Sequence, residues 1–285
     1  MQEHVTVHLA EPLVPLVSGL HGYRMSGLAA GSHVGMPSRD ITVIISLDEP
    51  MDMSVPGQGG VRLGSIVGGL HDRPVLIHHD GHQFGIQAAL TPAGARALLG
   101  VPAAELAGLV VGLDDLLGPA ARLLQERVVG AATWADRLRL VQAALLALLD
   151  RSTPPSESAA ATEIGEAWRV LARHDGDVAV RAVARHVGWS PRHLTERFTS
   201  EFGLRPKTTA RVMRFERSTR FVRAGARPAD VAATCGYADQ AHLTREWQAL
   251  AGVTPGRWPA SDVLANVQDP DGLPEAGWCH DHPHD

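Results

Sequence analysis

Histidine and cysteine offer the widest chemistry in this sequence, and they gather in two short segments. Residues 78–82 read His-His-Asp-Gly-His, and residues 279–285 read Cys-His-Asp-His-Pro-His-Asp. Zinc needs three or four such ligands in a fixed geometry. The first segment is typical of a solvated turn between strands, and the second is a short terminus that could hold a metal only loosely. We therefore predict no metal site, no cofactor and no catalytic residue.

The two cysteines give no further chemistry. Cys235 and Cys279 are too few for a disulfide framework. Cys235 stands directly before a glycine in a helical pattern, which indicates a small apolar core residue. Cys279 belongs to the terminal segment. Neither position favours an activated thiolate.

Polar residues recur at matching positions in two segments, 180–198 and 228–247. When Gly188 is aligned with Gly236, both segments carry Val-Ala before the glycine and an aromatic residue after it. Both then continue with His-Leu-Thr and a second aromatic residue, allowing a one-residue difference in the turn. Each is followed by Gly-x-x-Pro, at 203–206 and 252–255. The chain thus contains an internal repeat.

Each repeat makes physical sense as a helix-turn-helix unit. The glycine permits the positive φ that a sharp turn needs, and the alanine lets the second helix approach closely. Ser190 and Asp239 are good N-caps for the second helices. Leucine and an aromatic residue four positions later face inward in both, while the other residues are polar. Such a helix suits the major groove of DNA.

Residues 165–259, about a third of the chain, resemble the AraC/XylS family of bacterial transcription regulators. The resemblance is carried by the two units and by the pattern Gly-Tyr-x-Asp-Gln-x-His-Leu-x-Arg-Glu-Trp at 236–247. It implies a long helix between the units, at about 206–224. Five arginines recur there at helical spacing, at 211, 214, 217, 220 and 223. Some are expected to contact phosphates, others to pair with Glu216 or to face solvent.

The resemblance also implies which residues read bases. The first recognition helix would use Arg192, Thr195 and Glu196, and the second would use Gln240, Ala241, Thr244 and Arg245. Arginine can bind guanine in a bidentate manner, glutamine can bind adenine, and glutamate can accept from cytosine. Glu196 departs from the family pattern, so it either reads a cytosine or orients Arg192 or Arg197. We favour orientation, because a carboxylate near phosphates is costly.

Charge is divided along the chain in a way that fits a DNA partner. Residues 160–260 hold 15 Arg and one Lys against ten acidic residues, a net charge of +6. Residues 1–159 have a net charge of −5, and residues 261–285 have a net charge of −6. A basic module between acidic flanks indicates a polyanionic partner, although solvated helical faces are often basic too.

The first hundred residues have a β pattern. Segments 40–47, 61–67, 75–79 and 83–90 are apolar and bounded by Gly, Pro and Asp, which predicts short strands in a small barrel or sandwich. The resemblance implies a cupin-like barrel that senses a ligand, and segment 90–102 is similar to a stretch common in actinobacterial-type members. Tyr23, His33 and Arg39 are the polar residues expected to line its mouth and bind an effector.

Helical patterns follow the strands. We expect helices at 92–99, from about 114 to 128 and at 133–149, the first capped by Thr91. The apolar stripes of the last two either pack on the barrel or form a dimer interface. Packing is the usual role of one stripe, yet the family resemblance implies a homodimer through residues 115–150.

The predicted fold is α+β: a small cupin-like β-barrel with a helical dimerisation segment, then an all-α double helix-turn-helix domain. The expected boundaries are 1–150 for the sensing domain, 151–161 for a linker, 162–259 for the DNA-binding domain and 260–285 for a disordered acidic tail. No apolar run reaches the roughly 18 residues of a membrane span, and no signal peptide is evident. A cytoplasmic protein without a membrane partner is expected.

The resemblance implies a ligand-responsive, non-enzymatic regulator that binds promoter DNA and, if it activates, RNA polymerase. One alternative is a cupin-like metal-dependent enzyme fused to a DNA-binding module. It would need a His-x-His pattern with a later Glu, which residues 1–100 lack. A DNA-repair methyltransferase would need an activated thiol. A third reading is a ligand-independent regulator whose barrel only makes protein contacts.

Overall fold

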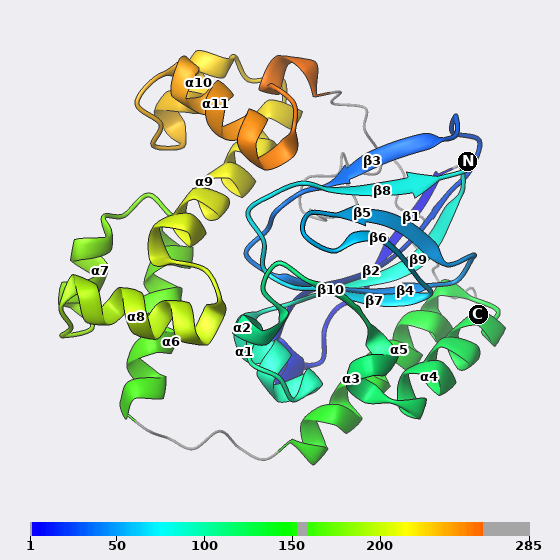
Figure 1. Cartoon of the computed structure of the whole chain (residues 1–285). Helices are drawn as coiled ribbons and strands as arrows, with labels where there is room; N and C mark the ends of the chain where they lie inside the picture. Colours follow the sequence, from blue (N-terminus) through cyan, green and yellow to red (C-terminus); the bar gives the residue numbers. More distant parts are fainter. Residues whose placement is uncertain (1, 153–158, 259–285) are drawn as a thin grey trace, which may run out of the picture.

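A β-rich N-terminal part and a helical C-terminal part make up the molecule (Figure 1). The computed structural model describes residues 2–152 and 159–258. Most of the predicted linker and the whole predicted tail, including Cys279 and the histidines beside it, lie outside these residues. Within the described ranges, no helix is long and apolar enough to cross a membrane.

The N-terminal part contains two facing antiparallel sheets. The first sheet has six strands in the order β1 (Gln2–Thr6), β2 (Val17–Met25), β9 (Gln83–Leu90), β4 (Ile41–Ser46), β7 (Ser65–Gly68) and β10 (Val110–Gly112). The second has four in the order β3 (Gly31–Gly35), β8 (Val75–His79), β5 (Met51–Val55) and β6 (Gly59–Leu63). The α+β class is confirmed. The β domain is an open pair of sheets, compatible with a cupin-like jelly roll, rather than one closed barrel.

Strand β4 shows why this sheet forms. Ile41, Val43 and Ile45 belong to the core beneath the sheet, whereas Ile44 belongs to the core between the two sheets. Both faces of the strand are therefore buried, which explains its nearly continuous β-branched run. The predicted strands at 75–79 and 83–90 are confirmed, and the segment predicted at 61–67 is divided between β6 and β7.

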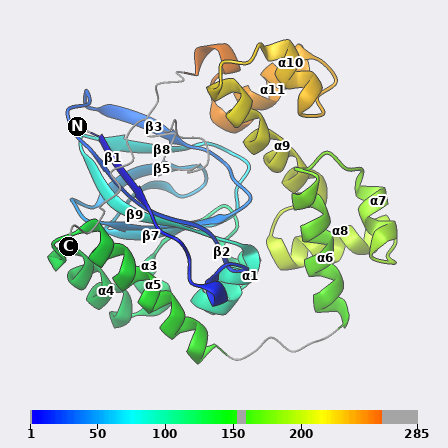
Figure 2. The same cartoon turned by 180° about the vertical axis from the view of Figure 1, so that it is seen from behind.

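Short helices and a hairpin cover the outer face of the six-stranded sheet (Figure 2). They are α1 (Pro92–Gly94), the π-helical turn η2 (Ala95–Leu99), α2 (Ala103–Leu106), α3 (Leu113–Leu117), α4 (Pro119–Gly130) and α5 (Trp134–Arg151). A 3-10 turn, η1 (Glu11–Leu13), lies near them. Thr91 caps α1 through its hydroxyl, as predicted. Gly118, with φ of 59°, separates α3 from α4, where one continuous helix was expected.

The hairpin α4–α5 packs on the sheet through the stripe predicted for its second helix. Leu138, Val141 and Leu145 of α5 are buried within the single chain. On α4 the buried residues are Ala121 and Val128, while Leu123 is 58% exposed. Packing on the sheet therefore accounts for the apolar stripe of α5. Part of the apolar surface of α4 remains exposed to solvent.

The C-terminal part is entirely helical. It contains α6 (Ala159–Arg173), α7 (Val180–His186), α8 (Pro191–Phe202), α9 (Pro206–Arg223), α10 (Pro228–Thr234), α11 (Gln240–Ala251) and the 3-10 turn η3 (Pro255–Arg257). The long helix predicted at about 206–224 is α9, and it joins the α7–α8 pair to the α10–α11 pair (Figure 1).

The two helix pairs differ in how they meet the N-terminal domain. One continuous apolar core runs from the six-stranded sheet through Leu106 of α2 to Leu194 and Phe198 of α8. A separate core surrounds Trp247 of α11, and the single fully buried contribution from the N-terminal domain to it is Met36. The first pair thus shares its core with the N-terminal domain, and the second pair is packed mainly on α9.

Candidate nucleic-acid interface

Both helix-turn-helix units are built by the local interactions that the sequence predicts. Gly188 and Gly236 have φ of 73° and 71°, the left-handed conformation that favours glycine. The Ser190 side chain accepts a hydrogen bond from the His193 N–H at 3.2 Å, and Asp239 accepts one from the His242 N–H at 2.6 Å. These caps start α8 and α11, so the predicted N-caps are confirmed.

A histidine packs against the turn in the same way in both units. The ring of His193 meets Trp189 edge-on at 4.7 Å between centroids, and the ring of His242 meets Tyr237 edge-on at 5.4 Å. The Nδ1 atom of His242 also accepts a hydrogen bond from the Ala238 N–H. These histidines therefore hold the turn to the start of the recognition helix.

The two units touch each other through the turn between α6 and α7. A Cβ atom on Gly236 would lie 2.5 Å from an Asp177 carboxylate oxygen, and one on Gly176 would lie 2.1 Å from the carbonyl oxygen of Ala210 in α9. Asp175 in the same turn has φ of 47°, the one positive value outside glycine among the described residues. The turn is thus wedged between α9 and the second unit.

The residues predicted to read bases in the first unit lie on the outer face of α8. The Arg192 side chain is 89% exposed and donates from Nε to Glu196 at 2.8 Å. This contact favours the orienting role over the reading of a cytosine, and the role of Glu196 stays a prediction. The Thr195 hydroxyl donates to the Pro191 carbonyl oxygen one turn earlier.

The corresponding residues of the second unit lie on α11. Gln240, Ala241 and Arg245 are exposed, and the hydroxyl of Thr244 donates to the Gln240 carbonyl oxygen as Thr195 does in α8. No hydrogen bond or ion pair of Arg245 is found within residues 2–152 and 159–258. The structure brings the seven predicted residues onto two equivalent helix faces, and their contact with DNA stays a prediction.

Several arginines of α9 have structural partners. Arg211 donates to Glu246 of α11 at 2.7 Å, Arg217 lies 3.9 Å from Asp175, and the guanidinium of Arg214 lies 5.8 Å from the ring centre of Tyr237. These contacts hold α9 to its neighbours. Glu216, expected to pair with arginines of this helix, binds Arg39 of the N-terminal domain, and the charge of Arg220 in α9 also acts on its carboxylate.

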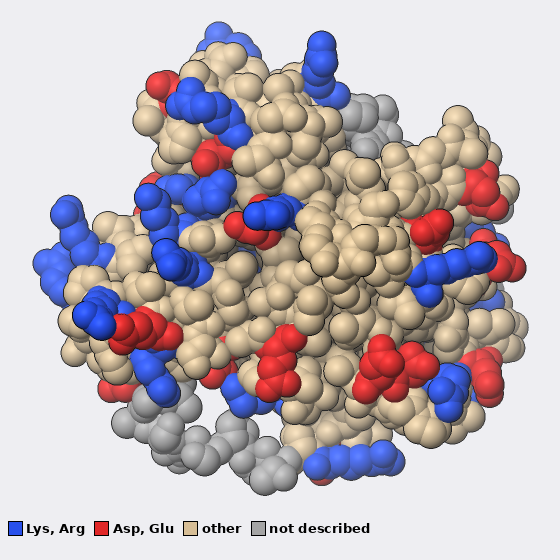
Figure 3. Space-filling model, viewed as in Figure 1, with Lys and Arg blue, Asp and Glu red and all other residues tan. Residues whose placement is uncertain are grey.

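Basic side chains crowd the part of the surface that lies over α7, α8 and α9 (Figure 3). Much of the acidic surface in the same view lies over the N-terminal domain. The charge division in the sequence is therefore also a division in space. Cationic side chains near a recognition helix attract a polyanion and displace its counterions.

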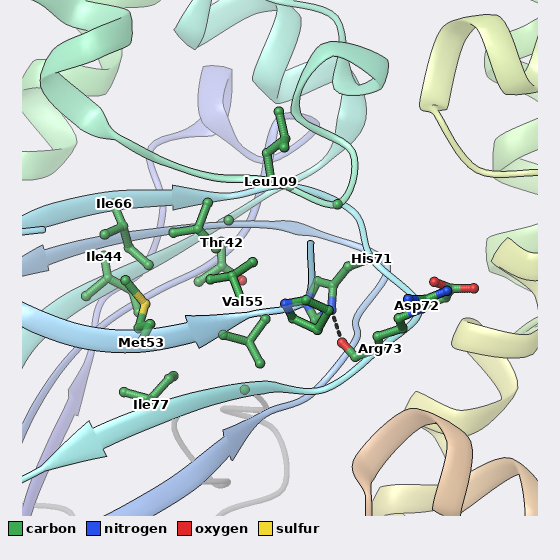
Figure 4. A pocket seen from close by; sticks show the side chains of 17 residues that line it. Thr42, Ile44, Met53, Val55, Ile66, His71, Asp72, Arg73, Ile77 and Leu109 are labelled. Carbon is green, nitrogen blue, oxygen red and sulfur yellow. Dashed lines mark hydrogen bonds between the residues drawn. The ribbon is translucent and has the colours of Figure 1, made fainter. Parts of the chain in front are cut away.

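The N-terminal domain contains a cavity of about 270 Å3 between the two sheets. Its walls are mainly apolar, with contributions from Ile44, Met53, Val55, Ile66, Val75 and Ile77. His71, Asp72 and Arg73 lie at the end nearest the C-terminal helices (Figure 4). Nδ1 of His71 is 2.6 Å from the carbonyl oxygen of Arg73, and burial lowers the pKa of His71. Such a cavity suits a compact ligand with one polar end.

The three residues predicted to bind an effector are not among those that line this cavity. Tyr23 is buried between the sheets, and burial raises its pKa. His33 is paired with Ile77 in the register of β3 and β8, and its ring lies 5.7 Å from that of His79. Burial, with a contribution from His79, lowers the pKa of His33 to about 3. An effector role for these two residues stays a prediction.

Arg39 lies at the boundary between the two domains. Its guanidinium donates to Asp175 at 2.8 Å, to Glu216, and to the carbonyl oxygen of Ala172 at 3.3 Å. The side chain is only 18% exposed, and although burial opposes its charge, the two carboxylates raise its pKa. The structure thus uses Arg39 to join the domains, which the sequence pattern did not indicate.

Cys235 and the histidine-rich segment 78–82 are the other groups considered from the sequence that the structure describes. Cys235 is fully buried, and burial raises its thiol pKa to about 11, as expected for a core residue. Within the described parts of the chain, no group of three or more His, Cys, Asp or Glu side chains is placed to hold a metal.

Comparisons with known proteins agree with the double helix-turn-helix geometry. Residues 183–261 match the family model described as "Helix-turn-helix domain". Residues of this chain are 30% identical over 67 positions to an uncharacterised HTH-type transcriptional regulator, YbfI, of Bacillus subtilis (strain 168). The match covers 24% of this chain and 24% of that regulator, so it spans about a quarter of each.

Solved structures with a similar overall fold also exist. An apo variant of ToxT from Vibrio cholerae has a TM-score of 0.52 with 8% sequence identity, over 83% of this chain and 95% of that one. A second ToxT structure from the same species has a TM-score of 0.47 with 11% identity, over 83% and 95% of the two chains. The likeness to the apo variant, at 8% identity, concerns the fold alone, and nothing is concluded from the second structure.

Proposed function

We propose that this chain, whose C-terminal part is an AraC-type helix-turn-helix domain, is a ligand-responsive regulator of transcription that binds promoter DNA in a sequence-specific manner. The observation that carries the proposal is the equivalence of the two units. Each presents a capped recognition helix with an exposed polar face, and one helix, α9, joins them. Two such helices suit adjacent segments of the major groove.

The seven residues on the outer faces of α8 and α11 are the proposed base readers. Arg192, Thr195 and Glu196 act in the first unit, and Gln240, Ala241, Thr244 and Arg245 act in the second. Arg245 is the strongest of them because its guanidinium has no carboxylate partner among the described residues. Arg192 approaches DNA together with Glu196, which reduces its net charge and fixes its direction.

The cavity of about 270 Å3 between the sheets is the proposed effector site. Its volume and aliphatic walls suit a compact, largely apolar molecule, with one polar group near His71. Residues 1–150 then act as the sensing domain and residues 162–259 as the DNA-binding domain. If the output is activation, RNA polymerase is a further partner.

Dimerisation through residues 115–150 belongs to the same proposal. Leu123 and Val129 of α4 are 58% and 49% exposed, although both side chains are apolar. Exposed apolar side chains on a surface helix favour contact with another protein surface. A second copy of the chain, paired through α4, would cover them.

The experiment that tests the DNA-binding proposal is selection of a duplex from a random-sequence pool by the full-length chain, followed by affinity measurements. We expect a defined consensus, an affinity that falls steeply as salt rises, and loss of discrimination in Arg245→Ala. Arg62→Ala is the matched control, because Arg62 lies on β6 and is 66% exposed. Recovery of no consensus by the unmodified chain would refute the proposal.

A further inference from the structure

Residues 35–42 pass from the cavity wall to the domain boundary and back within eight positions. Gly35 and Thr42, at the two ends of this segment, both line the cavity between the sheets. Met36 and Arg39, inside it, both contact the DNA-binding domain. The segment leaves the four-stranded sheet at the end of β3 and enters the six-stranded sheet at the start of β4.

The contacts of this segment reach both helix-turn-helix units and the helix between them. Met36 is 7% exposed and packs in the core that surrounds Trp247 of the second unit. Arg39 binds Glu216 of α9, and Asp175 in the turn that follows α6. That turn touches the second unit at Gly236, through Asp177. A movement of the segment therefore alters how the two units are held relative to each other.

The segment is firmly anchored, so a change at its cavity end is transmitted rather than absorbed. The Ser18 hydroxyl donates to the Asp40 carboxylate at 2.6 Å, and the Ser38 hydroxyl donates to the Asp40 carbonyl oxygen at 3.0 Å. Close-packed and hydrogen-bonded segments have few intermediate conformations, and they shift between discrete arrangements.

A second segment of the cavity wall, residues 73–75, also reaches the DNA-binding domain. Arg73 and Val75 line the cavity, and Pro74 between them is close to the end of α11. A Cβ atom on Gly252, the residue that ends α11, would lie 3.9 Å from Cγ of Pro74. Two separate segments of the cavity wall thus contain residues that meet the DNA-binding domain.

We infer that residues 35–42 couple occupancy of the cavity to DNA binding, with Met36 and Arg39 as the residues that transmit the change. The inference rests on the proposed function and names the regulation of its effector site. A ligand that fills the cavity displaces Gly35 and Thr42, and Arg39 then loses its alignment with Asp175 and Glu216. The spacing of α8 and α11 changes as a result, because both units depend on this contact.

The test uses cavity-filling substitutions in place of the unidentified ligand. Gly68→Val adds carbon atoms beside Thr42, where a Cβ atom would lie 3.9 to 4.0 Å from Thr42 atoms and so fits without a clash. Val55→Leu fills the cavity from the opposite sheet. The affinity of the full-length chain for its selected duplex is measured for each filler, for Arg39→Gln, and for the combined variants. Circular dichroism confirms that each variant is folded.

We expect a filler to change the dissociation constant for DNA by about fivefold or more, a usual size for coupling between sites. Arg39→Gln should shift it in the same direction. In the Arg39→Gln background a filler should change the dissociation constant further by less than about twofold, because the effects of coupled residues are not additive. Arg62→Gln is the matched control, and the full effect of the filler should persist in that background.

The outcomes separate this inference from the proposed function. If the unmodified chain selects no duplex, the proposed function fails. If it binds DNA and the fillers have no effect, or act equally with and without Arg39, the coupling through residues 35–42 is overturned. If both fillers unfold the protein, Arg39→Gln alone tests the inference. An affinity of Arg39→Gln for DNA equal to that of Arg62→Gln would then overturn the inference.

Discussion

The two helix-turn-helix units share one internal design and have different neighbours. Both have a capped recognition helix, a left-handed glycine in the turn, and an aromatic residue packed edge-on against a histidine. The core of the first unit continues into the N-terminal domain, whereas the core of the second is closed around α9 and Met36. Local sequence thus determines the structure of each unit, and the surrounding packing determines how tightly that unit is held to the N-terminal domain.

The largest expected difference between the units concerns their cores. Phe198 and Trp247 occupy matching positions and are fully buried. Replacing either by alanine should cost about 3–5 kcal/mol of stability, the usual range for a buried aromatic side chain. Phe198→Ala should also increase hydrogen exchange in the N-terminal domain, and Trp247→Ala should affect mainly α9–α11. If both substitutions increased hydrogen exchange to the same extent in the N-terminal domain and in α9–α11, the division into two cores would be contradicted.

The link between the units should give a measurable pH dependence. Burial raises the pKa of Glu216 to about 7, Arg39 and Arg220 oppose this, and Asp40 adds to it. Because the folded value lies above the ordinary value, the stability that Glu216 contributes is present at low pH and is lost as pH rises through about 7.

Glu216→Gln removes this titration while it keeps the shape of the side chain. Between about pH 5 and about pH 8, the unmodified chain should lose more stability than the variant, by at most about 3 kcal/mol. Urea unfolding at the two pH values measures the difference. A variant that loses as much stability as the unmodified chain would show that Glu216 ionises without cost at this boundary.

The recognition helices should differ in how much sequence discrimination they supply. Arg245→Ala should lose about 1–3 kcal/mol of discrimination at one base pair, because its guanidinium is available for bidentate contact. Arg192→Ala should lose less, since Glu196 already occupies one edge of that guanidinium at 2.8 Å. Affinities for single-substituted duplexes test the order, and a larger loss at Arg192 would reverse our comparison.

The smallest effect is expected at the helix caps. Ser190→Ala and Asp239→Ala should each cost about 1 kcal/mol, the typical value of an N-cap. Asp239 should be the more important, because its carboxylate makes the shorter hydrogen bond and carries a charge at the helix N-terminus. Thermal unfolding measures both, and Ser190→Thr and Asp239→Asn, which retain the capping oxygen, are the matched controls.

The helical domain could be predicted from its sequence because its determinants are local. Ser190 and Asp239 cap helices through bonds that span three residues, and Gly188 and Gly236 need only their own φ angles. The N-terminal strands β2 and β3 were not predicted. They contain glycine and histidine at positions where a recognisable strand would alternate apolar and polar residues. Their partner strands, β9 and β8, lie far along the chain.

The cavity and the domain boundary depend on contacts that no local pattern encodes. Arg39 meets Asp175 and Glu216 more than a hundred residues away, so its polar type suggested a ligand contact instead. The cavity is formed by strands of both sheets, and its apolar lining residues resemble any other core positions in the sequence. A charged residue just before an apolar segment, flanked by Ser38 and Asp40, was the one available sign of a buried polar network.

The contact between Asp177 and Gly236 has a consequence for the operator. Because the Asp177 carboxylate, in the turn that leads into the first unit, occupies the space beside the turn of the second, the units cannot tilt independently without breaking this contact. One extra base pair between half-sites would rotate them by about a tenth of a helical turn. A chain joined in this way tolerates base changes within a half-site better than a change in the spacing between half-sites.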